Sequence, residues 1–398
     1  MYLVAIQMLW GDRGKFLGLV LGIGFTAFLI TFAMAFFAGF MTRGFALISE
    51  NPSARIWVMD PAVHGTESTI NLPDSALKRV QSVAGVRVAL PLALGQVTAR
   101  FPNGRFQSFQ MIGVDSASLA GAPRLQKSRP VILHIPDSAI VDAGGTEGKL
   151  STPLREEDQW PADGAHLEAP SRPLRTGDIL LINDIRIRII GNSHAIPRFP
   201  PRPLLYATYE TVKHIKSSDP HHLTFVLVTP QPGISPDLLA RRITARTGLR
   251  ARTQAQFKSD TVRWYLINSE DVGDMSAMLV LAMTVGFGVT GIMLYMFTYE
   301  NLRQYALLKA IGISNHKLLR MIFLQSGGSA ILGSGIGIGI CALSSQLIHL
   351  SGLDYPFRLM WFGPVLALAG VFLISMTAAA ISAFPVMRLE PTEVLSRP

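Results

Sequence analysis

Four long apolar stretches constrain this chain more than any other feature of its sequence. None contains Asp, Glu, Lys or Arg, and they cover Phe16–Met41, Met275–Tyr299, Met321–Ile348 and Leu359–Met387. Each is longer than the roughly 20 residues that a helix needs to cross a hydrocarbon core of ~30 Å. Such uninterrupted stretches favour helices, because a helix satisfies its own backbone hydrogen bonds in lipid. We therefore predict an α-helical membrane protein with four transmembrane helices and a large α/β extracytoplasmic domain between helices 1 and 2.

Basic residues near the apolar stretches predict the orientation of the chain, because cytoplasmic loops carry an excess of Lys and Arg. Such residues lie before the first stretch, between the second and third, and after the fourth: Arg13, Lys15, Arg303, Lys309, Lys317, Arg320, Arg388 and Arg397. The loop between the third and fourth stretches has only Arg358. The pattern predicts a multi-pass protein of the bacterial inner membrane with both termini in the cytoplasm.

These features divide the chain into nine predicted parts. The transmembrane helices are expected at residues 16–43, 275–299, 321–348 and 359–387. A periplasmic α/β domain is expected at 44–274, in which 144–173 is polar and rich in Gly and Pro, and forms either a mobile insertion or a small subdomain. The remaining parts are an amphipathic cytoplasmic segment at 1–15, a cytoplasmic coupling hairpin at 300–320, an external loop at 349–358 and a cytoplasmic tail at 388–398.

The charge and cysteine content exclude some classes of function. The segment Gly44–Asp274 holds 26 Lys and Arg against 22 Asp and Glu, which is too balanced for a nucleic-acid partner. The single cysteine, Cys341, lies in the third apolar stretch, so the soluble domain has no disulfide and packing alone must stabilise it.

The soluble domain contains an approximate internal repeat. A strand at Ala54–Asp60, a helix from Pro73 to Val83 and a strand at Val86–Leu92 form the first half. A strand at Leu223–Thr229, a helix through Thr247 and a strand at Leu249–Thr253 form the second. Between the halves, the alternating segment Asp178–Gly191 predicts a hairpin with Asn183-Asp184 as its turn. We also expect Gln256–Asp274 to form one continuous helix that leads into the second transmembrane helix and transmits motion to the domain.

The loop from Glu300 to Arg320 carries the most specific pattern in the chain. An apolar stripe at helical spacing runs along it, formed by Tyr305, Leu307, Leu308 and Ile311. Arg303 and Lys309 lie beside the stripe, and Gly312 and Ser314-Asn315 are expected to end this helix and begin the next. The pattern predicts a short amphipathic helix against the membrane face or a cytoplasmic partner.

The residues of this loop closely resemble those of a known permease family. The sequence Glu300-x-x-Arg303-x-x-Ala306-Leu307-Leu308-Lys309-Ala310-Ile311-Gly312-x-Ser314 is similar to the loop of FtsX-like and macrolide-exporter (MacB-like) ABC permeases. The terminal Glu390-Pro391-Thr392-Glu393-Val394-Leu395 resembles the closing motif of that family. The opening Leu9-Trp10-x-Asp12-Arg13-Gly14-Lys15-Phe16 is similar to the heterocyst-glycolipid exporter permease (DevC-like) branch. No phosphate-loop motif accompanies these residues, unlike in the macrolide exporter itself.

The resemblance implies a non-catalytic permease subunit that transmits ATP-driven motion from the cytoplasm to the periplasm. ATP and Mg would then be bound by a separate ABC ATPase subunit, and this chain would bind no cofactor. A second permease copy in a homodimer, membrane lipid, a periplasmic adaptor and an outer-membrane channel are the other implied partners. The implied cargo is a lipid, glycolipid or hydrophobic compound. The residues expected to couple to the ATPase are Glu300, Arg303, Tyr305, Leu307, Leu308, Lys309, Ile311 and Gly312.

Other functions remain open from sequence. One alternative is an FtsX-type signalling permease that activates a cell-wall hydrolase, and another is a lipoprotein-releasing permease. An intramembrane enzyme is disfavoured, because the four stretches lack the Asp, Glu, Lys and paired His that mark such sites.

Two further patterns have a structural explanation. Gly333, Gly335, Gly337 and Gly339 alternate within the third apolar stretch, where small residues let helices approach closely, so we predict a helix-packing role rather than nucleotide binding. His214, His221 and His222 lie near Asp219 without a recognised ligand spacing, and we predict no metal site there. No credible catalytic set of nucleophile, base and orienting group is visible.

Overall fold

The structure is a computed structural model that divides into two compact units. It describes residues 7–8, 11, 13–123, 133–146, 148–162, 164–217, 219, 221–351 and 355–388. One unit comprises Met1–Phe40 with Glu270–Pro398, and the other comprises Met41–Ser269. The motif at 390–395, part of the opening motif and the centre of the predicted external loop lie outside the described residues.

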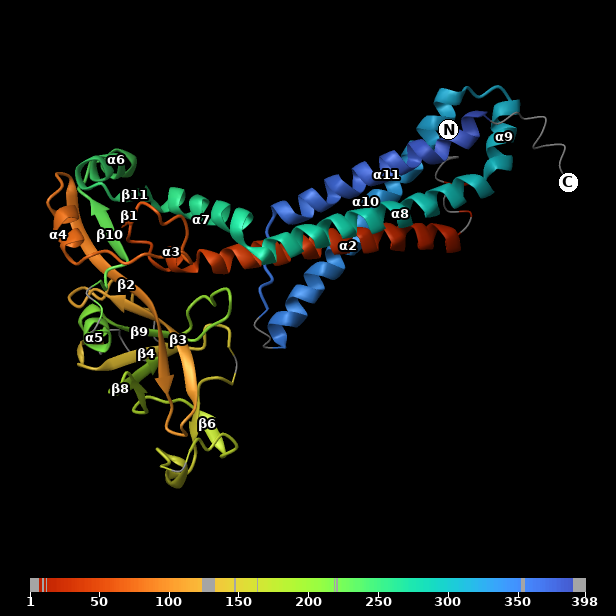
Figure 1. Cartoon of the computed structure of the whole chain (residues 1–398). Coiled ribbons are helices and arrows are strands. Elements are labelled where there is room, and N and C mark those ends of the chain that lie inside the picture. Colours follow the sequence, from red (N-terminus) through yellow and green to blue (C-terminus); the bar gives the residue numbers. More distant parts are fainter. Residues whose placement is uncertain are drawn as a thin grey trace. The chain divides into compact units, whose positions relative to one another are not determined.

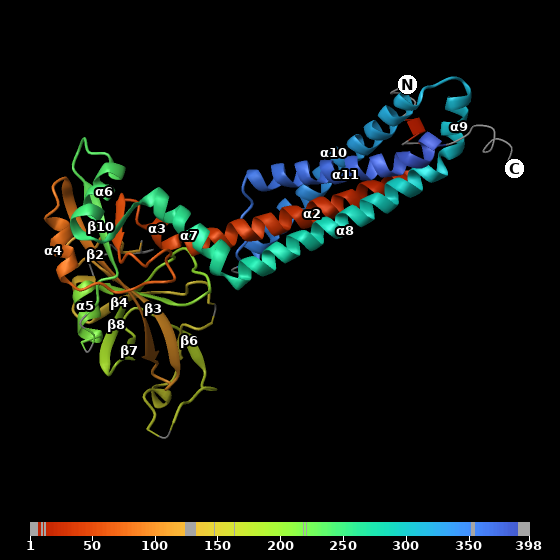
Figure 2. The same cartoon turned by 45° about the horizontal axis from the view of Figure 1, so that its top comes forward.

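The first unit is a bundle of four long helices, which are drawn in Figures 1 and 2. They are α2 (Arg13–Gly44), α8 (Glu270–Glu300), α10 (Asn315–Leu350) and α11 (Phe362–Arg388). All four contain segments long and apolar enough to cross a membrane, which confirms the four predicted apolar helices. The helices extend beyond the apolar stretches at several ends. In α8 this extension begins with Glu270 and Asp271, whose charges suit the positive end of the helix dipole.

Helix α2 is the most buried of the four spans. Its side chains Leu19, Ile23, Ala27 and Ile30 join those of the other helices in one apolar cluster. Small residues permit the close approach of α8, because a Cβ at Gly286 would lie 2.1 Å from Cγ2 of Thr26. The backbones of α2 and α8 can therefore approach each other only with glycine at this position.

The second unit contains the predicted repeat. The first half is β1 (Ile56–Met59), α4 (Ser75–Gln81) and β2 (Val86–Arg100), and the second is β10 (Phe225–Pro230), α6 (Pro236–Thr247) and β11 (Arg250–Thr253). These strands interleave in the antiparallel order β11-β1-β10-β2. The arrangement is that of two split βαβ units, as in ferredoxin-like folds.

Helices cover both faces of this sheet. Ile56 and Val58 of β1 join the apolar cluster that contains residues of α4 and α6. Trp57, between them in sequence, packs on the opposite face against Phe225 and Phe257, with ring centroids 5.4 and 5.6 Å away. Phe257 belongs to α7 (Gln254–Asn268), and α3 (Ala46–Glu50) contributes to the same cluster. The alternation of side chains along β1 therefore places the sheet between two helical layers.

A second set of strands closes into a ring. The strands are β3 (Phe106–Val114), β4 (Ser138–Asp142), β7 (Ile179–Ile182), β8 (Ile185–Asn192) and β9 (Leu204–Thr208). Their order from β2 is β3-β9-β4-β8-β7, and β7 pairs again with β2 at Ala99 and Arg100. The predicted hairpin is confirmed, since β7 and β8 pair as antiparallel neighbours and Asn183-Asp184 connects them. The φ values of 48° and 62° at these two residues are those of a type I′ turn.

The polar segment 144–173 forms a small subdomain in its described part. It contains β5 (Ser151–Pro153) paired with β6 (Ser171–Pro173), and a short 3-10 helix, η2 (Glu156–Asp158). Backbone hydrogen bonds join it to the turn between β2 and β3, from Trp160 N to Pro102 O at 2.5 Å and from His166 N to Asn103 O at 2.9 Å. The described part of the segment therefore has secondary structure of its own and contacts the β2–β3 turn.

The prediction of one continuous helix over Gln256–Asp274 is wrong. Helix α7 ends at Asn268 and α8 begins at Glu270, while Ser269 has extended backbone angles of φ −93° and ψ 122°. The physical reason is local, because serine in this conformation precedes a helix favourably and acidic residues suit the first helical turn. Ser269-Glu270-Asp271 therefore begins a new helix rather than continuing the old one.

Candidate functional site

The predicted amphipathic helix is α9 (Leu302–Ala310), between α8 and α10. Gly312 follows it with φ +95°, a left-handed conformation that favours glycine after a helix. Ser314 has extended angles and immediately precedes α10. The predicted end and restart of the helix around Gly312 and Ser314 are thus confirmed.

One side of α9 is fixed to the helical bundle. The Tyr305 hydroxyl, in a residue that is only 1% exposed, donates a 2.9 Å hydrogen bond to Oε1 of Gln325 on α10. Leu308 packs partly buried against the apolar cluster of the bundle. The Lys309 ammonium donates to the carbonyl oxygen of Met387 on α11 at 3.1 Å. The contacts of these residues connect α9 to two long helices.

The other side of α9 faces outward. Leu307 is 47% exposed and Ile311 is 80% exposed, although both are large aliphatic side chains. Arg303 and Gly312 are also exposed. At the end of α8, Glu300 forms an ion pair with Lys15 at 2.5 Å. The single apolar stripe expected from sequence therefore divides into an anchoring side, Tyr305 and Leu308, and an exposed side, which we call the α9 outer face: Arg303, Leu307 and Ile311.

The four alternating glycines of α10 also divide into two pairs. A Cβ at Gly333 would lie 2.7 Å from Ile23 Cγ2, and one at Gly337 would lie 2.1 Å from the Gly24 carbonyl oxygen, both on α2. A Cβ at Gly335 or Gly339 would meet no atom within 4 Å. This pattern follows from helical geometry, because residues four apart share a face and residues two apart do not. Within this chain, Gly335 and Gly339 thus do not line the contact with α2.

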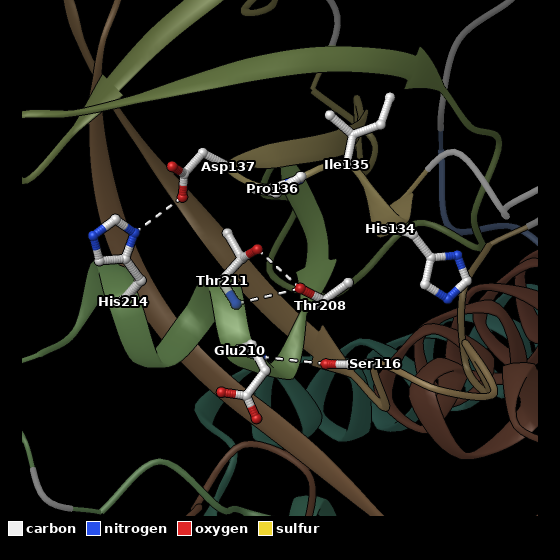
Figure 3. A pocket seen from close by; sticks show the side chains of 9 residues that line it. All are labelled: Ser116, His134, Ile135, Pro136, Asp137, Thr208, Glu210, Thr211 and His214. Carbon is white, nitrogen blue, oxygen red and sulfur yellow. Dashed lines mark hydrogen bonds and ion pairs between the residues drawn. The ribbon is translucent and has the colours of Figure 1, made fainter.

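A surface pocket of about 330 Å³ lies in the α/β unit, beside helix α5 (Tyr209–Ile215). Figure 3 shows its lining, in which His214 and Asp137 face each other with Nδ1 and Oδ1 3.0 Å apart. The hydroxyl of Thr208 is paired with that of Thr211 at 2.9 Å and caps α5. In Figure 3 the Thr208 and Thr211 hydroxyls bond to each other, and the Ser116 hydroxyl accepts from the backbone amide of Glu210. None of these three hydroxyls is drawn bonded to His214, as a nucleophile beside its base would be.

Two of the histidines for which we predicted no metal site, His214 and His221, contact different residues. His214 pairs with Asp137, and the backbone of His221 donates to Asp219. Among the residues that the structure describes, no group of three or more His, Cys, Asp or Glu side chains could hold a metal ion.

Sequence reasoning missed a buried charge cluster in the α/β unit. Arg198 donates to the Glu50 carboxylate at 2.5 Å, and the backbone amide of Ile196 donates to the same carboxylate at 2.7 Å. Tyr206 lies beside both charges, and its hydroxyl is 3.4 Å from Glu50. Glu50 is 148 residues from Arg198 and 156 from Tyr206, so no local pattern marks it as their partner.

The chain is similar in sequence to one family model and to permeases from one organism. Residues 276–391 match the family model described as FtsX-like permease C-terminal. An "Uncharacterized ABC transporter permease" of Mycobacterium tuberculosis, found in two strains, is 22% identical over 285 residues, which cover 71% of this chain and 68% of the relative. The chain is therefore similar to ABC transporter permeases, and its C-terminal third carries an FtsX-like permease domain.

Solved structures were also found that overlap about half of the chain. The periplasmic region of MacB from Actinobacillus actinomycetemcomitans is 11% identical with a TM-score of 0.36, covering 56% of this chain and 96% of its own. The extracellular domain of the transporter YknZ from Gram-positive bacteria is 13% identical with a TM-score of 0.33, covering 50% of this chain and 98% of its own.

Proposed function

We propose that the chain is the membrane permease subunit of an ABC transporter, which couples a separate cytoplasmic ATPase to movement of its own α/β domain. The match of residues 276–391 to the FtsX-like permease model and the similarity to ABC transporter permeases support this function. The cargo we propose is a lipid, glycolipid or hydrophobic compound, exported with a periplasmic adaptor and an outer-membrane channel by a homodimer of this chain.

The α9 outer face carries the proposal. Large aliphatic side chains are usually buried, so Leu307 and Ile311 on the outside of a short helix indicate a contact with another chain. Their basic neighbour Arg303 favours a partner surface with an apolar centre and acidic groups at its edge. We identify that partner as the ATPase.

The anchoring side of α9 provides the path for the motion. Tyr305 is hydrogen-bonded to α10 and Lys309 to α11. Displacement of α9 by the ATPase would thus move both helices together, because breaking the buried Tyr305–Gln325 hydrogen bond would leave polar groups unpaired.

The first experiment removes the α9 outer face. We expect the double substitution Leu307→Asp and Ile311→Asp to prevent copurification of the ATPase, since charges would enter an apolar contact. Leu238→Asp is the matched control, because Leu238 is 55% exposed on α6 and lies outside the α9 outer face. Equal ATPase retention by the double variant and the control would refute the docking role.

A second variant separates docking from coupling. Tyr305→Phe removes only the hydroxyl that donates to Gln325 and leaves the α9 outer face unchanged. We expect ATPase retention to be normal and cargo-stimulated ATP hydrolysis to fall. Leu308→Asp is unsuitable for either purpose, since Leu308 packs against the bundle and its loss would destabilise the fold.

The proposed orientation requires a test of its own. In a Cys341→Ser background, single cysteines at Ser151 and Ser217 should react with a membrane-impermeant thiol reagent in intact cells. A cysteine at Ser314, which precedes α10, should react only after permeabilisation. Labelling of Ser314 from outside would overturn the topology.

A further inference from the structure

A groove between α8 and α11 has a composition that the proposed ATPase coupling does not explain. The two helices pack against each other, and the groove has a volume of about 320 Å³. Its lining consists of Phe287, Gly288, Gly291, Ile292 and Tyr295 of α8 with Ala378, Ile381 and Ser382 of α11. A Cβ at Gly288 or Gly291 would meet no atom within 4 Å, so the space beside both glycines is open and a larger side chain at either position would enter it.

Ser382 distinguishes this groove from a merely apolar surface. The residue is 1% exposed, lines the groove, and its hydroxyl has no hydrogen-bond partner in the described structure. Some hydroxyls of the long helices donate to the carbonyl one turn earlier, as Ser344 does to Ile340 at 2.9 Å and Thr377 to Leu373 at 3.0 Å. Others are buried without a partner like Ser382, namely Thr290, Ser329, Ser334 and Ser375, but none of these lines the groove. A buried hydroxyl without a partner is costly, so an occupant that accepts a hydrogen bond would be favoured.

The depth of the groove indicates the kind of occupant. Helix α11 has 27 residues and is about 40 Å long, which matches a bilayer of about 40–45 Å that includes a hydrocarbon core of about 30 Å. Ser382 lies about 9 Å along the helix from Arg388, which places it close to the edge of the hydrocarbon core. Ala378 and Gly288 lie deeper. Tyr295, near the end of α8, lies at a level where tyrosine side chains are enriched in membrane proteins.

We propose that this groove binds one acyl chain of a membrane phospholipid, with the ester carbonyl oxygen of that chain accepting a hydrogen bond from Ser382. The apolar part of the chain would lie over Gly288 and Gly291. The ester group would lie at the shallow end, where phospholipids carry their carbonyls. The site depends on the helices being in a membrane and does not depend on the proposed coupling to an ATPase.

The test uses the full chain purified in detergent micelles that contain palmitoyl-oleoyl phosphatidylglycerol, with native mass spectrometry to count retained lipid. We expect the wild type to retain one phospholipid. In Gly291→Leu, whose side chain fills the groove, the fraction of protein with bound lipid should fall at least tenfold. Gly335→Leu is the matched control, since that glycine also has open space but lies on α10. Equal lipid retention by Gly291→Leu and Gly335→Leu would overturn the proposal.

A second arm tests the hydrogen bond without filling the groove. Ser382→Ala should lower retention about fivefold, as the loss of one hydrogen bond implies. The dialkyl ether analogue of the lipid, which lacks the carbonyl, should bind the wild type about fivefold less and should bind Ser382→Ala as weakly as the ester does. An ether lipid that binds the wild type as well as the ester would contradict the assigned hydrogen bond.

The same spectra distinguish the main alternative occupant, a helix from a second copy of the chain. If that copy fills the groove, Gly291→Leu will reduce the dimer fraction while leaving lipid retention unchanged, and the lipid proposal fails. If lipid retention falls while ATPase retention is normal, the lipid site stands whatever the fate of the proposed function.

Discussion

The buried pair Glu50–Arg198 provides the most quantitative test of the fold. The two side chains are 19% and 5% exposed, and Arg198 donates to Glu50 at 2.5 Å. Glu50→Gln preserves the shape of the side chain but leaves the Arg198 charge buried without its counter-ion. Breaking a buried pair in this way costs about 3–5 kcal/mol, and we expect about 3 kcal/mol because glutamine still offers an acceptor oxygen. For a unit of this size, that corresponds to a melting temperature lower by about 6–12 °C.

Thermal unfolding of the full chain in micelles, followed by tryptophan fluorescence, measures this shift. Trp57 is fully buried in the α/β unit and reports its unfolding. The control is Asp137→Asn, which breaks a pair with His214 whose side chains are 39% and 59% exposed, and should change stability little. Replacing both charges, by Glu50→Leu with Arg198→Met, should recover part of the loss, because no charge then remains buried. The reasoning is refuted if Glu50→Gln lowers the melting temperature no more than Asp137→Asn.

Three other predictions follow from particular contacts. Gly337→Leu should reduce the yield and thermal stability of the bundle in detergent, whereas Gly335→Leu should be tolerated; equal loss in both would disprove the packing pattern. Burial alone would raise the pKa of Asp178, but hydrogen bonds from Arg172 and from the Arg175 amide outweigh it and hold this pKa below the ordinary 3.8. Ionised Asp178 therefore stabilises the fold at neutral pH. The difference in melting temperature between wild type and Asp178→Asn should vanish as the pH falls below 3.8 toward the lowered pKa of the folded state. A difference that stays constant with pH would contradict this role of the Asp178 carboxylate. A Gly-Pro insertion at Ser269 should leave the export activity that we propose largely intact, because the helix already ends there. Loss of that activity would contradict this expectation and would mean that the junction must stay rigid.

Sequence periodicity predicted the elements that depend on neighbouring residues. The four apolar helices, the two βαβ halves and the turn at Asn183-Asp184 all follow from local patterns of hydrophobicity or turn residues. The break at Ser269 had a local signal as well, in the serine followed by two acidic residues, which the expectation of a continuous helix overlooked. The DevC-like resemblance, the dimer, the adaptor and the cargo remain predictions.

Contacts between distant residues could not be predicted in the same way. The α9 stripe gave the spacing of Tyr305, Leu307 and Ile311, but which of them points inward depends on Gln325 of the next helix. The return of β7 to β2 likewise depends on strands that meet only in the folded unit. A single sequence contains no information on such pairings beyond the hydrophobic pattern of each strand.

The interleaving of the two half-repeats has a consequence for how the protein is made. β1 pairs with β10 and β11, so that Ile56 lies opposite both Val228 and Thr253. Neither half can complete its sheet until the ribosome has made residue 253, long after α2 has emerged. Pairings of such long range form slowly and expose strand edges while they are missing. Until β10 and β11 have been made, β1 lacks both of its strand partners, so this stage of synthesis is where we expect the domain to be most prone to aggregation.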